Sequence, residues 1–373
     1  MQSFAIYRLP HADHATMIRQ TDGAPAELLS CEELNDRQGF VFAPFQVTPQ
    51  QPILLIRPDE VEALECRVKG ADFAAAVPPA LASTGQANSP LSTPYSPFST
   101  QHPPLSAPHS PLSTYAVDFA NFHAQILQGT FRKIVLARCA DEAVDPTLEP
   151  MTLFWQACER YPRLFISLIY TPKSGCWLTA TPEILLEGSG NEWRTIALAG
   201  TMRLEADQMD GEGETLTWST KNIQEQRIVA TYITECLEQF TGDFSEQGPY
   251  TARAANLVHL RSDFTFSLPD GSRLGSLLHT LHPTPAVCGL PKRDAFNFIV
   301  ANEHSPRRYY SGFQGALNLP SLGTHLYVSL RCMNIAGRQC RLYAGGGLLP
   351  ESDMQQEWQE TEAKMQTMRA LLK

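Results

Sequence analysis

The sequence predicts an α+β (mixed α/β) domain whose sheets are largely antiparallel. Strand-like segments occur in runs, and long helical segments lie between the groups of strands instead of alternating with single strands. With 373 residues, 43% of them hydrophobic, the chain can bury a large core. No GxGxxG motif follows a strand and no GxxxxGK[ST] motif occurs, so a dinucleotide or nucleoside-triphosphate site is not indicated.

Residues 1–77 are expected to form the N-terminal part of the sheet domain. Two apolar runs, at 40–45 and 53–56, have the composition of strands, and we expect them at a sheet edge. Residues 78–114 are rich in Pro and Ser and repeat the unit Ser-Pro-(Leu/Phe)-Ser-Thr. Such a segment buries too little apolar surface to offset the entropy of ordering it, which predicts a flexible surface excursion.

Residues 115–373 are expected to form the functional region. A helical stripe of Phe119, Phe122, Ile126 and Leu127 ends at Gly129, and a strand at 133–138 follows directly. Further strands are predicted at 164–170, 177–179, 184–186, 193–197, 326–333 and 339–343, and long helices at 151–160, 220–238 and 354–373.

Composition limits the partners and the location of the protein. The formal charge of −10, without a basic cluster, argues against a nucleic-acid partner, and no apolar run reaches the ~20 residues that span a bilayer. The first residues lack the basic and apolar segments of a signal peptide. Nine cysteines without CxxC spacing are typical of reduced thiols. We therefore expect a cytoplasmic protein, and the composition is compatible with a monomer.

The most informative segment is Gly345-Gly346-Gly347 and the helix after it. Three glycines allow a sharp turn whose N–H groups approach a ligand, and the following helix N-terminus favours an anion. Glu357, Glu360 and Lys364 form one stripe of that helix. Carboxylates beside an anion site indicate a bridging Mg²⁺, although a solvated charged helix is an alternative.

Three other ionisable residues are candidates for this chemistry. Glu225 continues the apolar face of its helix, so it needs a metal, a lysine or an arginine as partner. Lys133 and Glu183 each stand at the start of an apolar strand. A desolvated lysine can act as a base and a buried carboxyl as an acid, whereas a solvated strand end is the alternative for both.

Three segments could contact a small ligand. The segment 198–201, which contains Gly200 and Thr201, is interpreted as a tight turn where backbone can approach a ligand. A proline-stiffened loop carries His282. Arg331 interrupts an apolar strand, where it needs either a substrate carboxylate or an internal acid as partner.

Together these motifs resemble the chorismate-utilising enzymes, and within them the isochorismate synthases. The resemblance runs in order from about residue 115 to the C-terminus, over Lys133–Arg138, Thr181–Glu183, Leu198–Thr201, Glu225, His282–Gly289, Tyr310–Gly312, Arg331, Ala344–Gly347 and Glu357–Lys364. It implies two large antiparallel sheets flanked by helices, with Mg²⁺ and chorismate bound between them.

The resemblance also implies a role for each residue. Lys133 would activate water for attack at C2 of chorismate, and Glu183 would protonate the departing C4 hydroxyl. Glu225 and Glu360 would ligate Mg²⁺, with Glu357 adjacent or acting through water. The remaining residues would hold the substrate. The amides of Gly345, Gly346 and Gly347 would help to bind the ring carboxylate, and Arg331 and Lys364, with Tyr310, would bind the enolpyruvyl carboxylate. His282 would stand near the ring, and the backbone of Gly200 and Thr201 would approach the substrate.

Alternatives within the family remain open. A salicylate synthase would use the same base and acid and then eliminate pyruvate. An aminodeoxychorismate synthase is disfavoured because Ala199 replaces its nucleophilic lysine, and an anthranilate synthase because Asn222 replaces an acid of its metal site. A non-catalytic chorismate-binding protein is disfavoured, since it would have lost Lys133, Glu183 or an acid of the metal site, and none of these is missing. Two residues depart from the family pattern: Gln226 stands where a histidine is usual, and Gly346 stands where an alanine is commoner.

Overall fold

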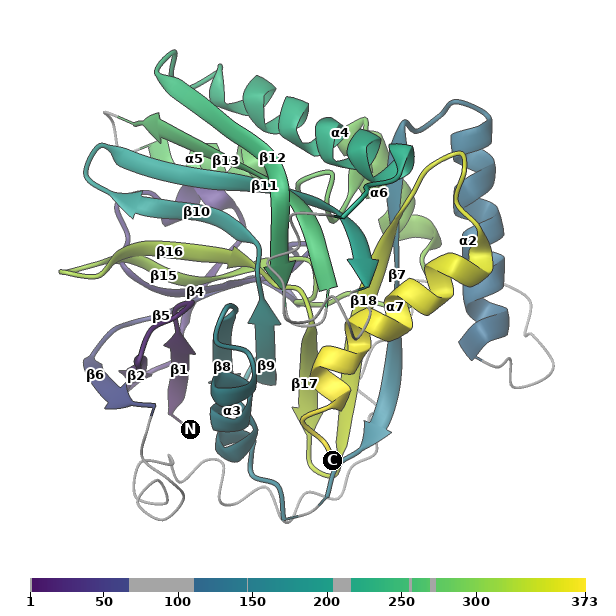
Figure 1. Cartoon of the computed structure of the whole chain (residues 1–373). Coiled ribbons are helices and arrows are strands. Elements are labelled where there is room, and N and C mark those ends of the chain that lie inside the picture. The colour runs from purple at the N-terminus through teal and green to yellow at the C-terminus, as the bar shows by residue number, and fades with distance from the viewer. Residues whose placement is uncertain (1, 67–110, 146, 204–215, 255–256, 269–272) are drawn as a thin grey trace.

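Two antiparallel sheets of nine strands each form the framework of the protein (Figure 1). The computed structural model describes residues 2–66, 111–145, 147–203, 216–254, 257–268 and 273–373. The first sheet has the order β14 (Gly289–Leu290), β7 (Lys133–Ala143), β18 (Gln339–Leu348), β17 (Cys332–Ala336), β9 (Gly175–Thr181), β8 (Phe165–Thr171), β1 (Ser3–Arg8), β2 (His14–Gln20) and β6 (Glu60–Glu65). The second has the order β12 (Phe244–Ala254), β13 (Leu257–Ser267), β11 (Glu192–Arg203), β10 (Ile184–Ser189), β16 (Gly323–Val328), β15 (Phe313–Leu319), β4 (Gly39–Ala43), β5 (Ile53–Ile56) and β3 (Ala26–Leu28).

Aromatic side chains join the two sheets face to face. Phe165 of β8 stacks on Tyr327 of β16, with ring centroids 4.3 Å apart. Phe42 of β4 meets Trp177 of β9 edge to face at 6.0 Å. Because both partners in each pair are buried, these contacts bury large apolar areas and fix the sheets against one another.

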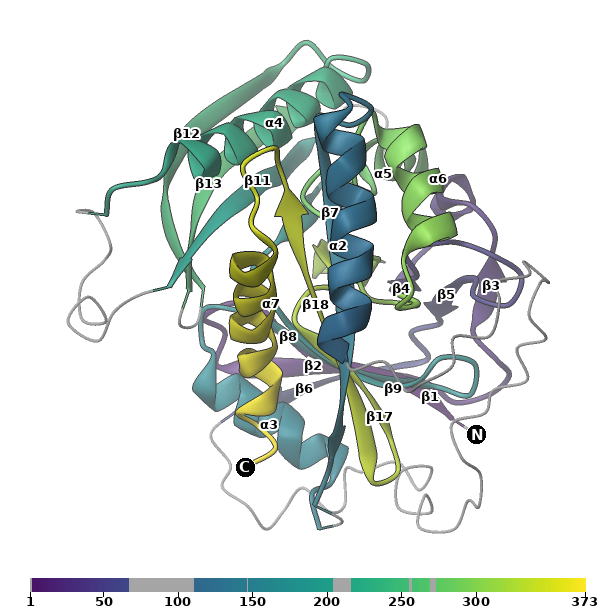
Figure 2. The same ribbon diagram turned by 90° about the vertical axis from the view of Figure 1, so that its right-hand side faces the viewer.

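Helices cover the outer faces of both sheets (Figures 1 and 2). They are η1 (Cys31–Leu34), α2 (Pro111–Leu127), α3 (Pro150–Arg160), α4 (Thr220–Leu237), α5 (Leu274–Leu281), α6 (Lys292–Asn302) and α7 (Met354–Arg369). The helix α4 packs on β11 and β13 of the second sheet, and α3 packs on β8 and β9 of the first. The helices α2 and α7 lie side by side next to β7 and β18. This is the predicted α+β architecture of two antiparallel sheets flanked by helices.

Several boundaries differ from the prediction. The expected strand at 326–333 is two strands, β16 and β17, which belong to different sheets. The runs at 40–45 and 53–56 form β4 and β5, but β3 lies outside them, so neither is the edge strand. Leu127 of the predicted apolar stripe is largely exposed.

Segments on both sides of the Pro/Ser-rich stretch contribute to the same sheets. Before it, β1, β2 and β6 join the first sheet, and β3, β4 and β5 join the second. Residues 78–110 of the predicted excursion lie outside the described residues. Its last four residues, 111–114, belong to α2, which begins at Pro111. In the part of the chain that the structure describes, no helix is long and apolar enough to cross a membrane.

Candidate active site

The predicted site residues gather where the chain crosses from one sheet to the other. Glu183 lies in the two-residue link between β9 of the first sheet and β10 of the second. Arg331 lies in the link between β16 and β17, which crosses back. A cavity at this junction is lined by nine of the predicted residues: Glu183, Gly200, Thr201, Glu225, Tyr310, Arg331, Gly345, Gly347 and Lys364.

Arg331 presents a buried guanidinium to the cavity. Its backbone φ is +47°, a conformation rare for a residue with a side chain, and it explains why the predicted single strand is broken here. The guanidinium donates to the Ala254 carbonyl at 3.2 Å and to His259 Nε2 at 2.6 Å. Burial lowers its pKa to about 10, so it stays charged at neutral pH. Among the described residues no acid forms an ion pair with it, which leaves its charge available for an external anion.

His259 of β13 is a site residue that the sequence did not indicate. It lines the cavity, and its Nδ1 lies 3.0 Å from the Gly200 carbonyl while Nε2 accepts the Arg331 bond. These partners place the proton on Nδ1, and burial, followed by the charge of Arg331, lowers the pKa of His259 well below its usual value. A single histidine in an apolar strand gives no signal in the sequence that distinguishes it from a core residue.

Gly200 sits at a bulge in β11, not in the tight turn that was predicted. The pairing of β11 with β13 shifts register between Ala199 and Thr201, and the φ of Gly200 is +67°. A Cβ at Gly200 would lie 3.0 Å from the Asn222 Cβ, so the bulge requires glycine. The bulge directs the Gly200 N–H toward Glu225 Oε2, at 3.3 Å.

Lys133 is fully buried, so the solvated strand end is excluded for this residue. Its Nζ lies 2.8 Å from Glu225 Oε1, although among the described residues no acceptor is aligned for this nitrogen to donate a hydrogen bond. Burial would raise the pKa of Glu225, but Lys133, Lys364 and Lys221 outweigh it and hold the pKa below its usual value. Lys133 does not line the cavity itself, although it contacts Glu225 and packs against Gly347, which both do.

Glu183 is a carboxyl held in an apolar environment. Its exposed fraction is 3%, and burial raises its pKa to about 8, against the opposing charges of Lys133, Lys364 and Arg331. Most of the Glu183 population is therefore protonated at neutral pH. A protonated carboxyl facing the cavity can donate a proton to a leaving group.

The glycine triplet lies within strand β18, so the expected sharp turn is wrong. Gly345, Gly346 and Gly347 pair with Ala137, Leu136 and Val135 of β7 in regular antiparallel register. A Cβ at Gly345 would lie 2.9 Å from the Tyr310 hydroxyl, and one at Gly346 would lie 2.8 Å from Glu357 Oε2.

A Cβ at Gly347 would collide with Glu225 Oε1 and lie 2.6 Å from Lys133 Cε. The missing side chains therefore make room for the polar groups that pack against this strand.

The N-terminus of α7 is capped by its own chain. Asp353 accepts hydrogen bonds from the Gln355 and Gln356 amides, both at 3.0 Å. These bonds satisfy two of the free N–H groups at the helix start, and its role as an anion site stays a prediction.

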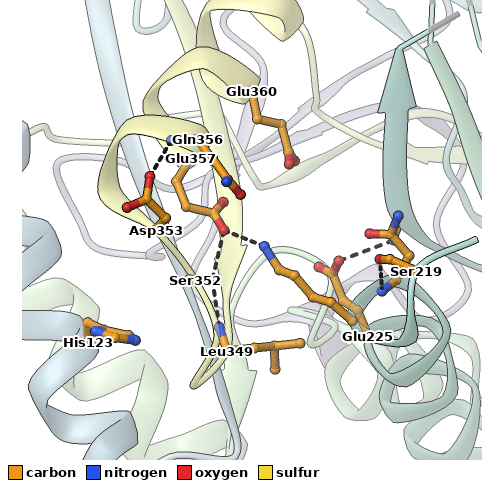
Figure 3. Close-up of polar contacts among 12 residues, drawn as sticks. His123, Ser219, Glu225, Leu349, Ser352, Asp353, Gln356, Glu357 and Glu360 are labelled. Carbon is orange, nitrogen blue, oxygen red and sulfur yellow. Dashed lines mark hydrogen bonds and ion pairs between the residues drawn. The ribbon is translucent and has the colours of Figure 1, made fainter.

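Figure 3 shows Glu225 of α4 and the acids Glu357 and Glu360 of α7 on neighbouring elements. Each of the three acids forms an ion pair with a lysine. Glu357 is buried, and its Oε1 accepts from the Ser352 hydroxyl at 2.7 Å and pairs with Lys221. Glu360 lies 2.7 Å from Lys364 Nζ.

Several features of these acids fit a divalent cation. Glu357 Oε2 is buried without a hydrogen-bond partner among the described residues, and burial and the charge of Glu360 raise the pKa of Glu357. Burial would lower the pKa of Lys221, but Glu357, Glu360 and Glu225 outweigh it and raise the pKa. In the described part of the chain, no three acidic, histidine or cysteine side chains are close enough to hold a metal. Carboxylate oxygens are nevertheless the donors that Mg²⁺ prefers.

The remaining predicted residues differ in their access to the cavity. Lys364 Nζ donates to the Gly345 carbonyl at 2.9 Å, and Tyr310 is buried beside it. His282 does not line the cavity, and its ring packs on Phe313 with centroids 5.1 Å apart. Burial, with the charge of Lys292, lowers the pKa of His282 to about 3, so this ring is neutral.

Gln226, which follows Glu225, is anchored to the neighbouring sheet. Its Nε2 donates to the Ser262 hydroxyl of β13 at 2.9 Å. This contact holds the first turns of α4 against the strand although a histidine is usual at this position.

Comparison with known proteins gives three findings. The family model described as chorismate binding enzyme matches residues 84–373. The isochorismate synthase MenF of Escherichia coli K12 is 34% identical over 66% of this chain and 57% of its own length, and the isochorismate synthase EntC of the same strain is 30% identical over 63% and 61%. The chain thus matches about three fifths of the length of these curated relatives. The solved structure of the menaquinone-specific isochorismate synthase from Escherichia coli aligns with a TM-score of 0.74 at 25% identity, covering 100% of this chain and 89% of that one.

Proposed function

The chain belongs to the chorismate-binding enzyme family, and from this premise we propose that it isomerises chorismate to isochorismate. The observation that carries the proposal is that a buried lysine, Lys133, and a buried carboxyl whose pKa is raised to about 8, Glu183, both lie at this junction of the sheets. One group can accept a proton and the other can donate one, which water addition with loss of a hydroxyl requires.

Proton balance assigns the two groups to opposite ends of the reaction. Lys133 would accept a proton from the water whose oxygen bonds to C2. The ring double bonds would shift, and the C4 hydroxyl would leave as water with the proton of Glu183. Glu225, 2.8 Å from Lys133 Nζ, stabilises the ammonium that results.

The anionic substrate needs cationic and backbone partners in the cavity. Arg331 and Lys364 would bind the enolpyruvyl carboxylate, with Tyr310 nearby, because guanidinium and ammonium groups both donate to carboxylates. The absence of side chains at Gly345 and Gly347 lets Tyr310, Glu225 and Lys133 pack against the strand at the edge of the cavity.

The acids of α4 and α7 would hold Mg²⁺. Glu225 and Glu360 would ligate the metal directly and Glu357 directly or through water. When bound, Mg²⁺ supplies positive charge that neutralises the ring carboxylate of chorismate.

A product assay tests the proposal. Purified protein, chorismate and Mg²⁺ are incubated, the products are separated by chromatography, and pyruvate is followed in parallel. Isochorismate without pyruvate, abolished by EDTA, is expected. Salicylate with an equal amount of pyruvate would identify a salicylate synthase, and no consumption of chorismate would indicate a binding protein.

The variant Lys133→Ala separates chemistry from binding. We expect it to lose turnover and to bind chorismate in the presence of Mg²⁺ as the parent does, measured by calorimetry. Near-normal turnover would remove Lys133 as the base.

Isochorismate would feed menaquinone or siderophore synthesis, a prediction that depends on the resemblance alone. A cytoplasmic location, a monomeric state and the lack of a nucleic-acid partner also stay predictions from composition.

A further inference from the structure

Lys221, in the first turn of α4, is the lysine of this region that the proposed reaction does not use. Its ammonium pairs with Glu357 Oε1, across the gap between α4 and α7. Lys133 and Lys364, which pair with Glu225 and Glu360, both have proposed roles with water or substrate. Lys221 does not line the cavity.

The position of Lys221 makes it a counter-ion of the acids that would hold the metal. The carboxylates of Glu357, Glu360 and Glu225 each raise the pKa of Lys221, and Glu357 has the largest effect. Glu357 has an exposed fraction of 1%, and its second oxygen has no hydrogen-bond partner in the described chain. A buried carboxylate with an unsatisfied oxygen is costly unless a cation lies nearby.

We propose that Lys221 is an exchangeable counter-ion, which holds Glu357 before the metal binds and lowers the affinity of the site for divalent cations. This inference rests on the metal site of the proposed function. An ammonium and a divalent cation repel one another at short range, so Lys221 must move away from Glu357, or weaken the binding if it stays.

The side chain of Lys221 is suited to such a movement. Its exposed fraction is 26%, whereas that of Lys133 is 0%, so Lys221 can return to water without opening the core. The flexible stem of lysine and the strong hydration of its ammonium lower the cost of leaving. Ser352 still donates to Glu357 Oε1 at 2.7 Å, so the carboxylate keeps one partner after the exchange.

The test is a titration of the protein with Mn²⁺ alone, in which electron paramagnetic resonance measures the free ion. The parent is compared with Lys221→Met and Lys221→Gln, which remove the charge, and with Lys221→Arg, which keeps it. Lys173→Met is the matched control, because Lys173, on the turn between β8 and β9, forms an ion pair with the exposed Glu27 of β3. Thermal unfolding shows which variants are folded.

We expect the two neutral variants to bind Mn²⁺ at least about fivefold more tightly than the parent, since a repulsive charge has been removed. Lys221→Arg and Lys173→Met should bind as the parent does. Equal or weaker binding by a folded neutral variant, or loss of folding in both, would overturn the counter-ion role and show that Lys221 is structural. If the parent itself binds no Mn²⁺, the metal site of the proposed function fails, which is a different outcome.

Discussion

Replacing Glu183 by Gln should stabilise the protein at neutral pH while it abolishes turnover. The folded environment favours the protonated carboxyl, with a pKa of about 8 against 4.5 in the ordinary case, because the side chain is buried at the junction of the sheets. In the unfolded chain the carboxyl ionises freely above pH 4.5. The contribution of Glu183 to stability is therefore fully present below pH 4.5 and is lost as the pH rises toward 8.

The size of this effect follows from the pKa difference. Each unit of pKa difference corresponds to about 1.4 kcal/mol. Relative to low pH, ionisable Glu183 therefore lowers the free energy of unfolding by about 3 kcal/mol at pH 7 and by about 5 kcal/mol above pH 9. Glutamine has nearly the same shape and does not ionise, so Glu183→Gln avoids this cost. Its amide also cannot donate the proton that the proposed reaction needs.

Urea denaturation of both proteins between pH 5 and pH 8.5 measures the difference. The free energy of unfolding of the parent should fall relative to that of Glu183→Gln as the pH rises. Glu192→Gln is the control, because Glu192 is an exposed carboxylate on β11. Parallel curves for the parent and Glu183→Gln would refute the raised pKa, and with it the role of Glu183 as the acid.

Three further substitutions test other parts of the site. Gly347→Ala places a methyl group against Glu225 and Lys133, so it should weaken Mn²⁺ binding about tenfold or more. The circular dichroism spectrum should be retained, and unchanged Mn²⁺ binding would contradict the packing described. Arg331→Lys keeps the charge but cannot reach both Ala254 and His259, so the KM for chorismate should rise about tenfold with a smaller change in kcat. A large fall in kcat with little change in KM would argue against a role of Arg331 in anchoring the substrate. Trp177→Ala should lower the free energy of unfolding by about 3–5 kcal/mol, measured in urea; a loss below about 1 kcal/mol would show that the sheet interface is loosely packed.

Regular elements with a strong apolar pattern were well predicted from the sequence. The helix predicted at 151–160 is α3 (Pro150–Arg160), and the one at 220–238 is α4 (Thr220–Leu237). The strand at 133–138 exists and extends to Ala143. Short-range periodicity suffices for such elements because each buries a continuous face.

The errors share a different cause, since they depend on contacts between distant segments. The glycine triplet looks like a turn, but pairing with β7 keeps it extended, and its lack of side chains serves Tyr310, Glu357 and Glu225. The break at Arg331 needs a positive φ that no local pattern announces. His259 matters because of its bonds to Arg331 and Gly200, both distant in sequence.

The ion pairs were also outside the reach of sequence patterns. The sequence indicated that Glu225 needs a partner but left a metal, a lysine or an arginine open. The structure brings Lys133 to it, yet the metal-binding role of the three acids stays a prediction.

The two links that cross between the sheets have a consequence for folding. Glu183 and Arg331 reach the cavity only after both sheets have formed and docked, because each residue lies between strands of different sheets. Contacts of such long sequence separation form slowly, since the loops that they close cost entropy before the contacts stabilise anything. We therefore expect binding competence to be recovered late during refolding, after most of the secondary structure has returned.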